Sequence, residues 1–172
     1  MVTLRELKEK DAPLMLEWMH DKDIQKGFKK NMNGQTLDNA VRFCKAEKIP
    51  DNISSGQSVH FAIVDENDEY LGTISLKEID LENENAEYAI VLRKKAQGNG
   101  IATEATRLVL DAAFKKYCLH RVYLTVLADN KSAIKLYERC GFKLEGEFRE
   151  HLKINGKYVN WKWYGILRQD FQ

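Results

Sequence analysis

Apolar residues recur along this chain with two different periods, and these periods predict its strands and helices. Segments in which apolar residues alternate with polar ones, or run together between turn-forming residues, indicate strands. The strands predicted in this way cover residues 2–7, 59–64, 70–79, 86–92, 121–127, 142–149 and 158–167. Between the last two strands, Asn155-Gly156 is typical of a type I′ hairpin turn.

Apolar residues at helical spacing predict helices, and suitable residues mark their ends. Asp11 is expected to cap the first helix and Thr36 the second. A third helix follows the strand at 86–92. The last one runs from a cap at Asp129 or Asn130 to Gly141, which suits the C′ position.

The order of these elements predicts the fold class. Residues 25–35 and 49–57 are rich in turn-forming residues and are expected to be loops. The remaining order is β-α-α-β-β-β-α-β-α-β-β. It indicates a single α/β (α+β) domain over residues 1–172, with a mixed, largely antiparallel sheet of about seven strands and about four flanking helices.

The charge and cysteine content exclude several classes of protein. Among 172 residues, 27 basic and 26 acidic side chains nearly cancel, so no strong field attracts nucleic acid or an anionic membrane. No apolar stretch approaches the ~20 residues that span a bilayer, and the N-terminus has no signal-peptide pattern. Cys44, Cys118 and Cys140 are expected to be buried free thiols, and the histidines lack metal-ligand spacing. The sequence thus predicts a cytoplasmic protein with no metal, nucleic-acid or membrane partner.

The segment Gln97-Gly98-Asn99-Gly100-Ile101-Ala102 lies between a predicted strand and a predicted helix, which is typical of an anion site. The first N–H groups of a helix lack partners, its dipole favours negative charge, and glycine lets a phosphate approach the backbone. A P-loop would need Lys-Ser/Thr after a glycine, and a dinucleotide fingerprint would need Gly or Ala where Thr103 stands. Both alternatives are disfavoured. The helix is expected to bury Ile101, Ala105, Leu108, Val109, Ala112 and Ala113.

Two motifs together identify the ligand by resemblance. Gln97-x-x-Gly100-x-Ala102 resembles the Q/R-x-x-G-x-G/A motif of the GCN5-related N-acetyltransferase (GNAT) superfamily, which cradles the pyrophosphate of acetyl-CoA. Further along, the stretch from Asn130 to Phe142 resembles the family's N-x-x-A-x-x-x-Y-x-x-x-G-F signature. The resemblance covers essentially the whole chain. It implies the GNAT fold, N-acetyltransferase activity and acetyl-CoA as co-substrate.

The resemblance also implies roles for individual residues. Tyr137 would lie beside the coenzyme A sulfur as general acid, because a phenol with a pKa near ~10 can protonate a thiolate; the alternative is that it only packs the core. Glu87 is a candidate general base, or else a charge at a strand edge. Asn130 caps its helix, bonds the pantetheine arm, or does both. The cofactor-binding residues implied are Ile90, Val91, Leu92, Gln97, Gly98, Asn99, Gly100, Ile101, Ala102, Thr103, Asn130 and Ser132.

Two further patterns have a structural and a functional interpretation. Arg93-Lys94-Lys95 is either a solvated charge run or a contact for the 3′-phosphate of coenzyme A. Trp161 and Trp163 fall on one face of the last strand, with Tyr164 opposite, and this stripe is expected to be core rather than a ligand site.

The acceptor of the acetyl group is less directly indicated. Trp18-x-x-Asp21-x-x-Ile24 resembles an element of the branches that acetylate ribosomal-protein N-termini and nucleotide-linked amino sugars. Residues 147–158 also resemble the spermidine acetyltransferases. A small-molecule amine, either an amino sugar or a polyamine, is therefore favoured over a protein N-terminus. A non-catalytic acyl-CoA sensor is the alternative of a different class, and a homodimer is compatible with the sequence.

Overall fold

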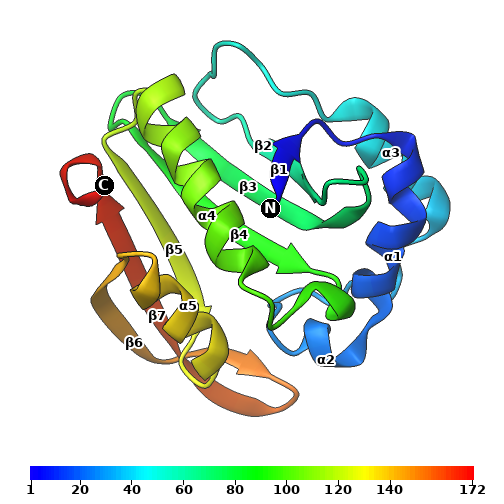
Figure 1. Ribbon diagram of the computed structural model, residues 1–172. Helices are drawn as coiled ribbons and strands as arrows, with labels where there is room; N and C mark the ends of the chain where they lie inside the picture. The colour runs from blue at the N-terminus through cyan, green and yellow to red at the C-terminus, as the bar shows by residue number, and fades with distance from the viewer.

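The computed structural model describes residues 1–172 and contains a seven-stranded sheet in the order β1-β2-β3-β4-β5-β7-β6 (Figure 1). Neighbouring strands are antiparallel except β4 and β5, which are parallel. The expected strands and the mixed, largely antiparallel sheet are confirmed. The strands are β1 (Thr3–Arg5), β2 (Val59–Val64), β3 (Tyr70–Asp80), β4 (Asn85–Leu92), β5 (Arg121–Leu127), β6 (Lys143–Ile154) and β7 (Lys157–Leu167).

Five α-helices accompany the sheet, one more than the sequence indicated. They are α1 (Ala12–His20), α2 (Lys22–Gln25), α3 (Leu37–Ala46), α4 (Ile101–Asp111) and α5 (Lys131–Arg139). The additional helix, α2, follows Asp21, whose carboxylate accepts the backbone N–H groups of Asp23 (2.8 Å) and Ile24 (3.1 Å). The polar segment that ends α1 therefore caps a further helical turn.

The structure confirms one expected helix cap and corrects another. Thr36 Oγ1 accepts the N–H of Asn39 at 3.2 Å, as expected for the cap of α3. Asp11 makes no side-chain capping bond to α1. Its buried carboxylate instead accepts the N–H of Lys8 (2.8 Å) and pairs with Arg5 (2.7 Å), because a guanidinium is the stronger partner.

Hydrophobic clusters lie on both faces of the sheet. The larger one, with 26 buried residues, includes the inner faces of α4 and α5, and the smaller one, with 10, includes those of α1 and α3. On α4 the expected face is partly wrong, because Leu108 is 38% exposed while Leu110 is fully buried. The helix turns Ala105, Thr106, Val109 and Leu110 inward and continues as a π-helical turn, η3 (Ala112–Lys116).

The parallel pair β4–β5 is held by a short ladder. Its register contains three residue pairs, Asn85 with Arg121, Ala86 with Val122 and Glu87 with Tyr123. Beyond these pairs the two strands diverge (Figure 1). The edge of β4 from Tyr88 onward therefore has no partner in β5, and its backbone groups on that side are free for a ligand.

The hairpin turn agrees with the sequence-based expectation, whereas one of the three cysteines does not. Asn155 and Gly156 have φ of 49° and 78°, which confirms the type I′ turn between β6 and β7. Cys44 is buried and Cys140 is half-buried, but Cys118 is exposed, so the expectation of buried thiols is wrong for Cys118. No helix has the length and apolar character needed to cross a membrane.

Candidate active site

The turn between β4 and α4 forms an open cradle of backbone N–H groups. Gly98 and Gly100 have φ of 82° and 76°, a left-handed conformation that favours glycine, and Gly100 is the residue from which α4 begins. A Cβ built on either glycine would meet nothing within 4 Å. The side-chain amide of Gln97 donates to the carbonyl of Leu92 at 3.3 Å and closes the turn onto β4. The cradle thus has the open space and the donors that a pyrophosphate needs.

A buried hydrogen-bond chain fixes the first turn of α4 to β4. Thr106 Oγ1 donates to the carbonyl of Ala102 at 2.6 Å, and the hydroxyl of Tyr88 in turn donates to Thr106 Oγ1 at 2.7 Å. Sequence reasoning missed both hydroxyls. Their positions in the sequence could have indicated them, because alternation along β4 places Tyr88 on the face that α4 covers.

Tyr137 lies on that same face of the sheet. Its ring packs edge-on against Tyr88, with centroids 5.7 Å apart, and against Phe142 at 6.1 Å. Its hydroxyl makes no hydrogen bond within the chain, and burial raises its pKa to about 12. The ring therefore belongs to the core, as one interpretation of the sequence proposed. The hydroxyl remains protonated and uncommitted, which the general-acid hypothesis requires.

Asn130 caps α5, as one of its two interpretations predicted. Its Oδ1 accepts the N–H of Ala133 at 3.3 Å and the hydroxyl of Ser132 at 3.2 Å. Its Nδ2 makes no hydrogen bond, and a Cβ built on Gly27 would lie 3.4 Å from it. The amide can therefore cap the helix through its oxygen and donate to a ligand through its nitrogen.

Glu87 lies on the other face of β4 from Tyr88. Its neighbours in register are Lys77 on β3 and Tyr123 on β5, and it makes neither an ion pair nor a hydrogen bond. The expected alternation of Glu87, Ala89 and Val91 holds. The two candidate catalytic side chains, Glu87 and Tyr137, thus approach the diverging strands from opposite faces of the sheet.

Arg93 is a structural residue and does not belong to a solvated run. It is 5% exposed, and its guanidinium bonds Glu17 at 2.7 and 3.0 Å, Glu69 at 2.7 Å and the carbonyl of Tyr70 at 2.9 Å. Lys94 pairs with Asp23 at 3.4 Å, and Lys95 pairs with Glu69. The proposed contact of this run with a 3′-phosphate is therefore wrong for Arg93, whose donors are already used.

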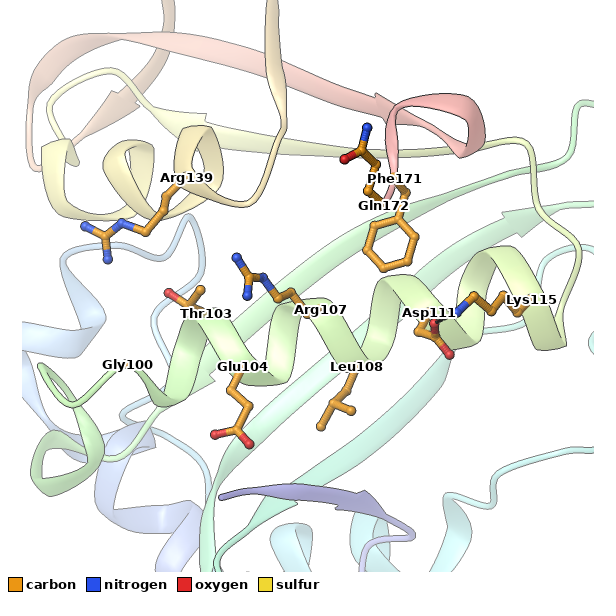
Figure 2. A pocket seen from close by; sticks show the side chains of 10 residues that line it. All are labelled: Gly100, Thr103, Glu104, Arg107, Leu108, Asp111, Lys115, Arg139, Phe171 and Gln172. Atoms are coloured by element: carbon orange, nitrogen blue, oxygen red, sulfur yellow. Dashed lines mark ion pairs between the residues drawn. The ribbon is translucent and has the colours of Figure 1, made fainter.

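Two other cations lie next to the cradle. A surface pocket of about 640 Å³ begins at Gly100 and follows the outer side of α4 (Figure 2). Thr103 and Arg107 leave α4 on the side that faces α5, which contributes Arg139 to the same pocket. Lys115 in this pocket is paired with Asp111, whereas neither arginine forms an ion pair.

The tryptophans of β7 form a half-exposed aromatic surface instead of core, which corrects the expectation for Trp161 and Trp163. We define the aromatic cluster as five side chains of β5, β6 and β7: Tyr123, Phe148, His151, Trp161 and Trp163. Tyr164, on the other face, is fully buried. Residues that share a register position share a face, so the aromatic cluster lies on the face of Glu87. The alternation in the sequence placed the two tryptophans on one face of β7, but it could not show that this face lacks a covering helix.

The cradle can be tested with a matched pair of glycine variants. Gly100→Ala should weaken binding of CoA by about tenfold, comparable to losing one charge-assisted hydrogen bond. Gly56→Ala is the control, because Gly56 has φ of 80°, equally open surroundings and a place in a distant loop. Both variants carry the same backbone strain, about 1–2 kcal/mol. Calorimetric titration with CoA separates the two, and equal affinity in all three proteins would contradict the cradle.

Comparisons with known proteins agree with this geometry. A family model described as the acetyltransferase (GNAT) domain matches residues 1–143. The spermidine N(1)-acetyltransferase of Escherichia coli K12 is 34% identical over 118 residues, which cover 69% of this chain and 63% of that protein. A putative ribosomal N-acetyltransferase of Bacillus subtilis is 33% identical over 101 residues, covering 59% of this chain and 55% of that protein. The chain thus spans less than two thirds of the length of these relatives.

A solved structure covers nearly the whole chain. The crystal structure of spermidine N-acetyltransferase from Vibrio cholerae in complex with CoA and spermine superposes with a TM-score of 0.86 at 28% identity. The superposition covers 99% of this chain and 97% of that one. It confirms the fold that the two motifs implied.

Proposed function

This chain belongs to the GNAT acetyltransferase family, and from that premise we propose that it transfers the acetyl group of acetyl-CoA to a primary amine of a polyamine. The observation that carries the proposal is Tyr137, a tyrosine with a buried ring whose hydroxyl has no partner in the chain, beside two strands that separate next to an open helix N-terminus. The ring packs in the core, but the hydroxyl is not enclosed there, so it is accessible to a ligand.

We assign the cofactor-binding roles to residues of both halves of the sheet. The N–H groups of 98–103 would hold the pyrophosphate, and the free edge of 90–92 would bond the pantetheine arm together with Asn130 and Ser132. Arg107 and Arg139, which form no ion pairs next to the cradle, would bind the 3′-phosphate of coenzyme A.

Acetyl-CoA supplies the activated acyl group, and the residues of this chain move the protons. A primary amine with a pKa near ~10.4 is mostly protonated at neutral pH, so a base must remove a proton before it can attack. We assign the removal of this proton to the carboxylate of Glu87, which makes no ion pair and would act directly or through water. Tyr137, on the opposite side of the strands, gives its proton to the departing thiolate.

The choice of a polyamine rests on the relatives and on the aromatic cluster. The E. coli and V. cholerae relatives are named for spermidine acetylation, and Glu87 shares its face with an aromatic cluster suited to cations. The name of the B. subtilis relative supports a protein N-terminus as the second candidate acceptor.

A turnover assay with a panel of acceptors tests the proposal. Release of the free CoA thiol would be measured with spermidine, a nucleotide-linked amino sugar and a short peptide with a free N-terminus. Spermidine should give the highest kcat/KM. A higher value with the peptide would favour the second candidate. CoA binding without turnover of any amine would support the acyl-CoA sensor and overturn the proposed transfer.

A further inference from the structure

The aromatic cluster already holds an ammonium group of the protein itself. Lys29, in the segment between α2 and α3, places its Nζ 4.1 Å from the centre of the Trp161 ring. Trp161 stacks on His151 with centroids 5.1 Å apart and a plane angle of 10°, and the edge of Phe148 approaches it at 6.4 Å. These neighbours hold the indole in place and leave one of its faces to a cation.

Lys29 differs from the lysines around it. Lys26 and Lys94 both pair with Asp23, at 2.9 and 3.4 Å, whereas Lys29 has no carboxylate partner. The ring is thus its one close partner. An exposed lysine held by a ring alone is weakly bound, and a second cation of higher local concentration can displace it.

The aromatic cluster also contains a polar group without a partner. Trp163 Nε1 is buried and has no hydrogen-bond acceptor. Trp163 stacks on Tyr123 at 5.4 Å and meets Trp161 edge-on at 5.8 Å, so it connects the ring under Lys29 to the strand beside Glu87. Buried polar groups normally have partners, so this unsatisfied donor distinguishes the aromatic cluster from an ordinary core.

Charge connects the two ends of this surface. Burial, and after it the nearby Glu87 carboxylate, raise the pKa of Tyr123, which places Glu87 at one end of the aromatic cluster. Trp161 stands opposite Leu127, which lies four residues, or about 13 Å, along β5 from Tyr123. Because β5 lies between the strands of Glu87 and Trp161, the Cα atoms of these two residues are about 16 Å apart. A carboxylate and a cation-binding ring at this separation suit an extended chain with an ammonium at each end.

We propose that the face of Trp161 covered by Lys29 is a subsite for the distal ammonium group of a long di- or polycationic acceptor, and that Lys29 occupies this subsite until the acceptor displaces it. The inference rests on the proposed function for the chemistry at the proximal amine, but the binding step stands by itself. Trp161 then sets selectivity for polycations, and Lys29 acts as an internal competitor that weakens the binding of all of them.

A matched pair of acceptors isolates the second charge. 1,8-Diaminooctane and octylamine share an eight-carbon chain and differ only in the distal amine, so the ratio of their kcat/KM values reports on the subsite. Lys29→Gln should raise this ratio, and Trp161→Leu should lower it, each by about fivefold, the fold-change expected for one exposed cation–π contact. Trp161→Phe keeps a ring and should fall between the wild type and Trp161→Leu.

The tip of the β6–β7 hairpin offers a control. Lys153 lies 5.4 Å from the ring of the exposed Tyr158, so Lys153→Gln and Tyr158→Leu remove a similar contact elsewhere. Both should leave the ratio at the wild-type value. If Trp161→Leu also leaves it there, the subsite is overturned while acetyl transfer stands.

A binding measurement without acetyl-CoA separates the inference from the proposed function. Titration with 1,8-diaminooctane should change the tryptophan fluorescence of the wild type saturably, and Lys29→Gln should lower the midpoint. Trp161→Phe should lose most of this change. If no amine is acetylated but this pattern is seen, the proposed function fails and the subsite stands. A fluorescence response that is unchanged in Trp161→Phe overturns the subsite.

Discussion

Replacing Tyr137 with phenylalanine should lower kcat for amine acetylation by about 100-fold or more, the contribution of a well-placed general acid. Affinity for CoA should stay close to that of the wild type, because the ring contacts with Tyr88 and Phe142 remain and no internal hydrogen bond is lost. Since burial raises the pKa of Tyr137 to about 12, the hydroxyl keeps its proton throughout the usual assay range. The loss of rate should therefore be independent of pH.

Two comparisons make this result specific. Tyr164→Phe removes the hydroxyl of another buried tyrosine, which donates to Glu138 at 3.1 Å, and should cost about 1 kcal/mol of stability while leaving kcat near the wild-type value. Glu87→Gln should also slow the reaction, but its defect should shrink as the pH rises toward the pKa of the amine, where less proton removal is needed. Steady-state kinetics of the three variants, measured over a range of pH, give these changes in kcat. A wild-type kcat in Tyr137→Phe would remove this residue as general acid.

Replacing Arg93 with alanine should lower the free energy of unfolding by about 2 kcal/mol, because it leaves the buried carbonyl of Tyr70 without a donor and removes charge-assisted bonds to two partly exposed carboxylates. The variant leaves the carboxylates of Glu17 and Glu69 and the carbonyl of Tyr70 without their shared donor. For a chain of this length, the melting temperature should fall by about 6 °C. Urea unfolding followed by circular dichroism measures the change.

The neighbouring Lys94 provides the control for this stability effect. It is exposed and has a single pair at 3.4 Å with Asp23, so Lys94→Ala should change stability by less than about 1 kcal/mol. Because Arg93 joins α1 to the strand that leads into the cradle, CoA affinity should fall in Arg93→Ala and not in Lys94→Ala. Equal stability of the two variants would contradict the structural role of Arg93.

The features that the sequence predicted well are encoded by neighbouring residues. Gly98, Gly100 and the Asn155-Gly156 turn adopt the positive φ that their residue types favour, and Thr36 caps the helix next to it. Each of these depends on contacts within a few positions, so a local pattern is enough to find them.

The features that it predicted poorly depend on residues far apart in the chain. Arg93 resembles a solvated charge because its partners Glu17 and Glu69 lie 76 and 24 positions away. Asp11 precedes α1 as a cap residue would, but in the folded chain its carboxylate pairs with Arg5. For Trp161, alternation identifies the face of the strand, but whether a helix covers that face depends on the tertiary structure.

The short ladder between β4 and β5 has a mechanical consequence. It joins two parts of the sheet, β1 to β4 and β5 to β7, through only three residue pairs, so few backbone bonds hold the two parts together at this seam. A molecule that binds both the glycine turn after β4 and Asn130 after β5 would bridge the seam. Its binding energy would then add to the cohesion between the two parts, and donor binding would stiffen the protein before the amine arrives.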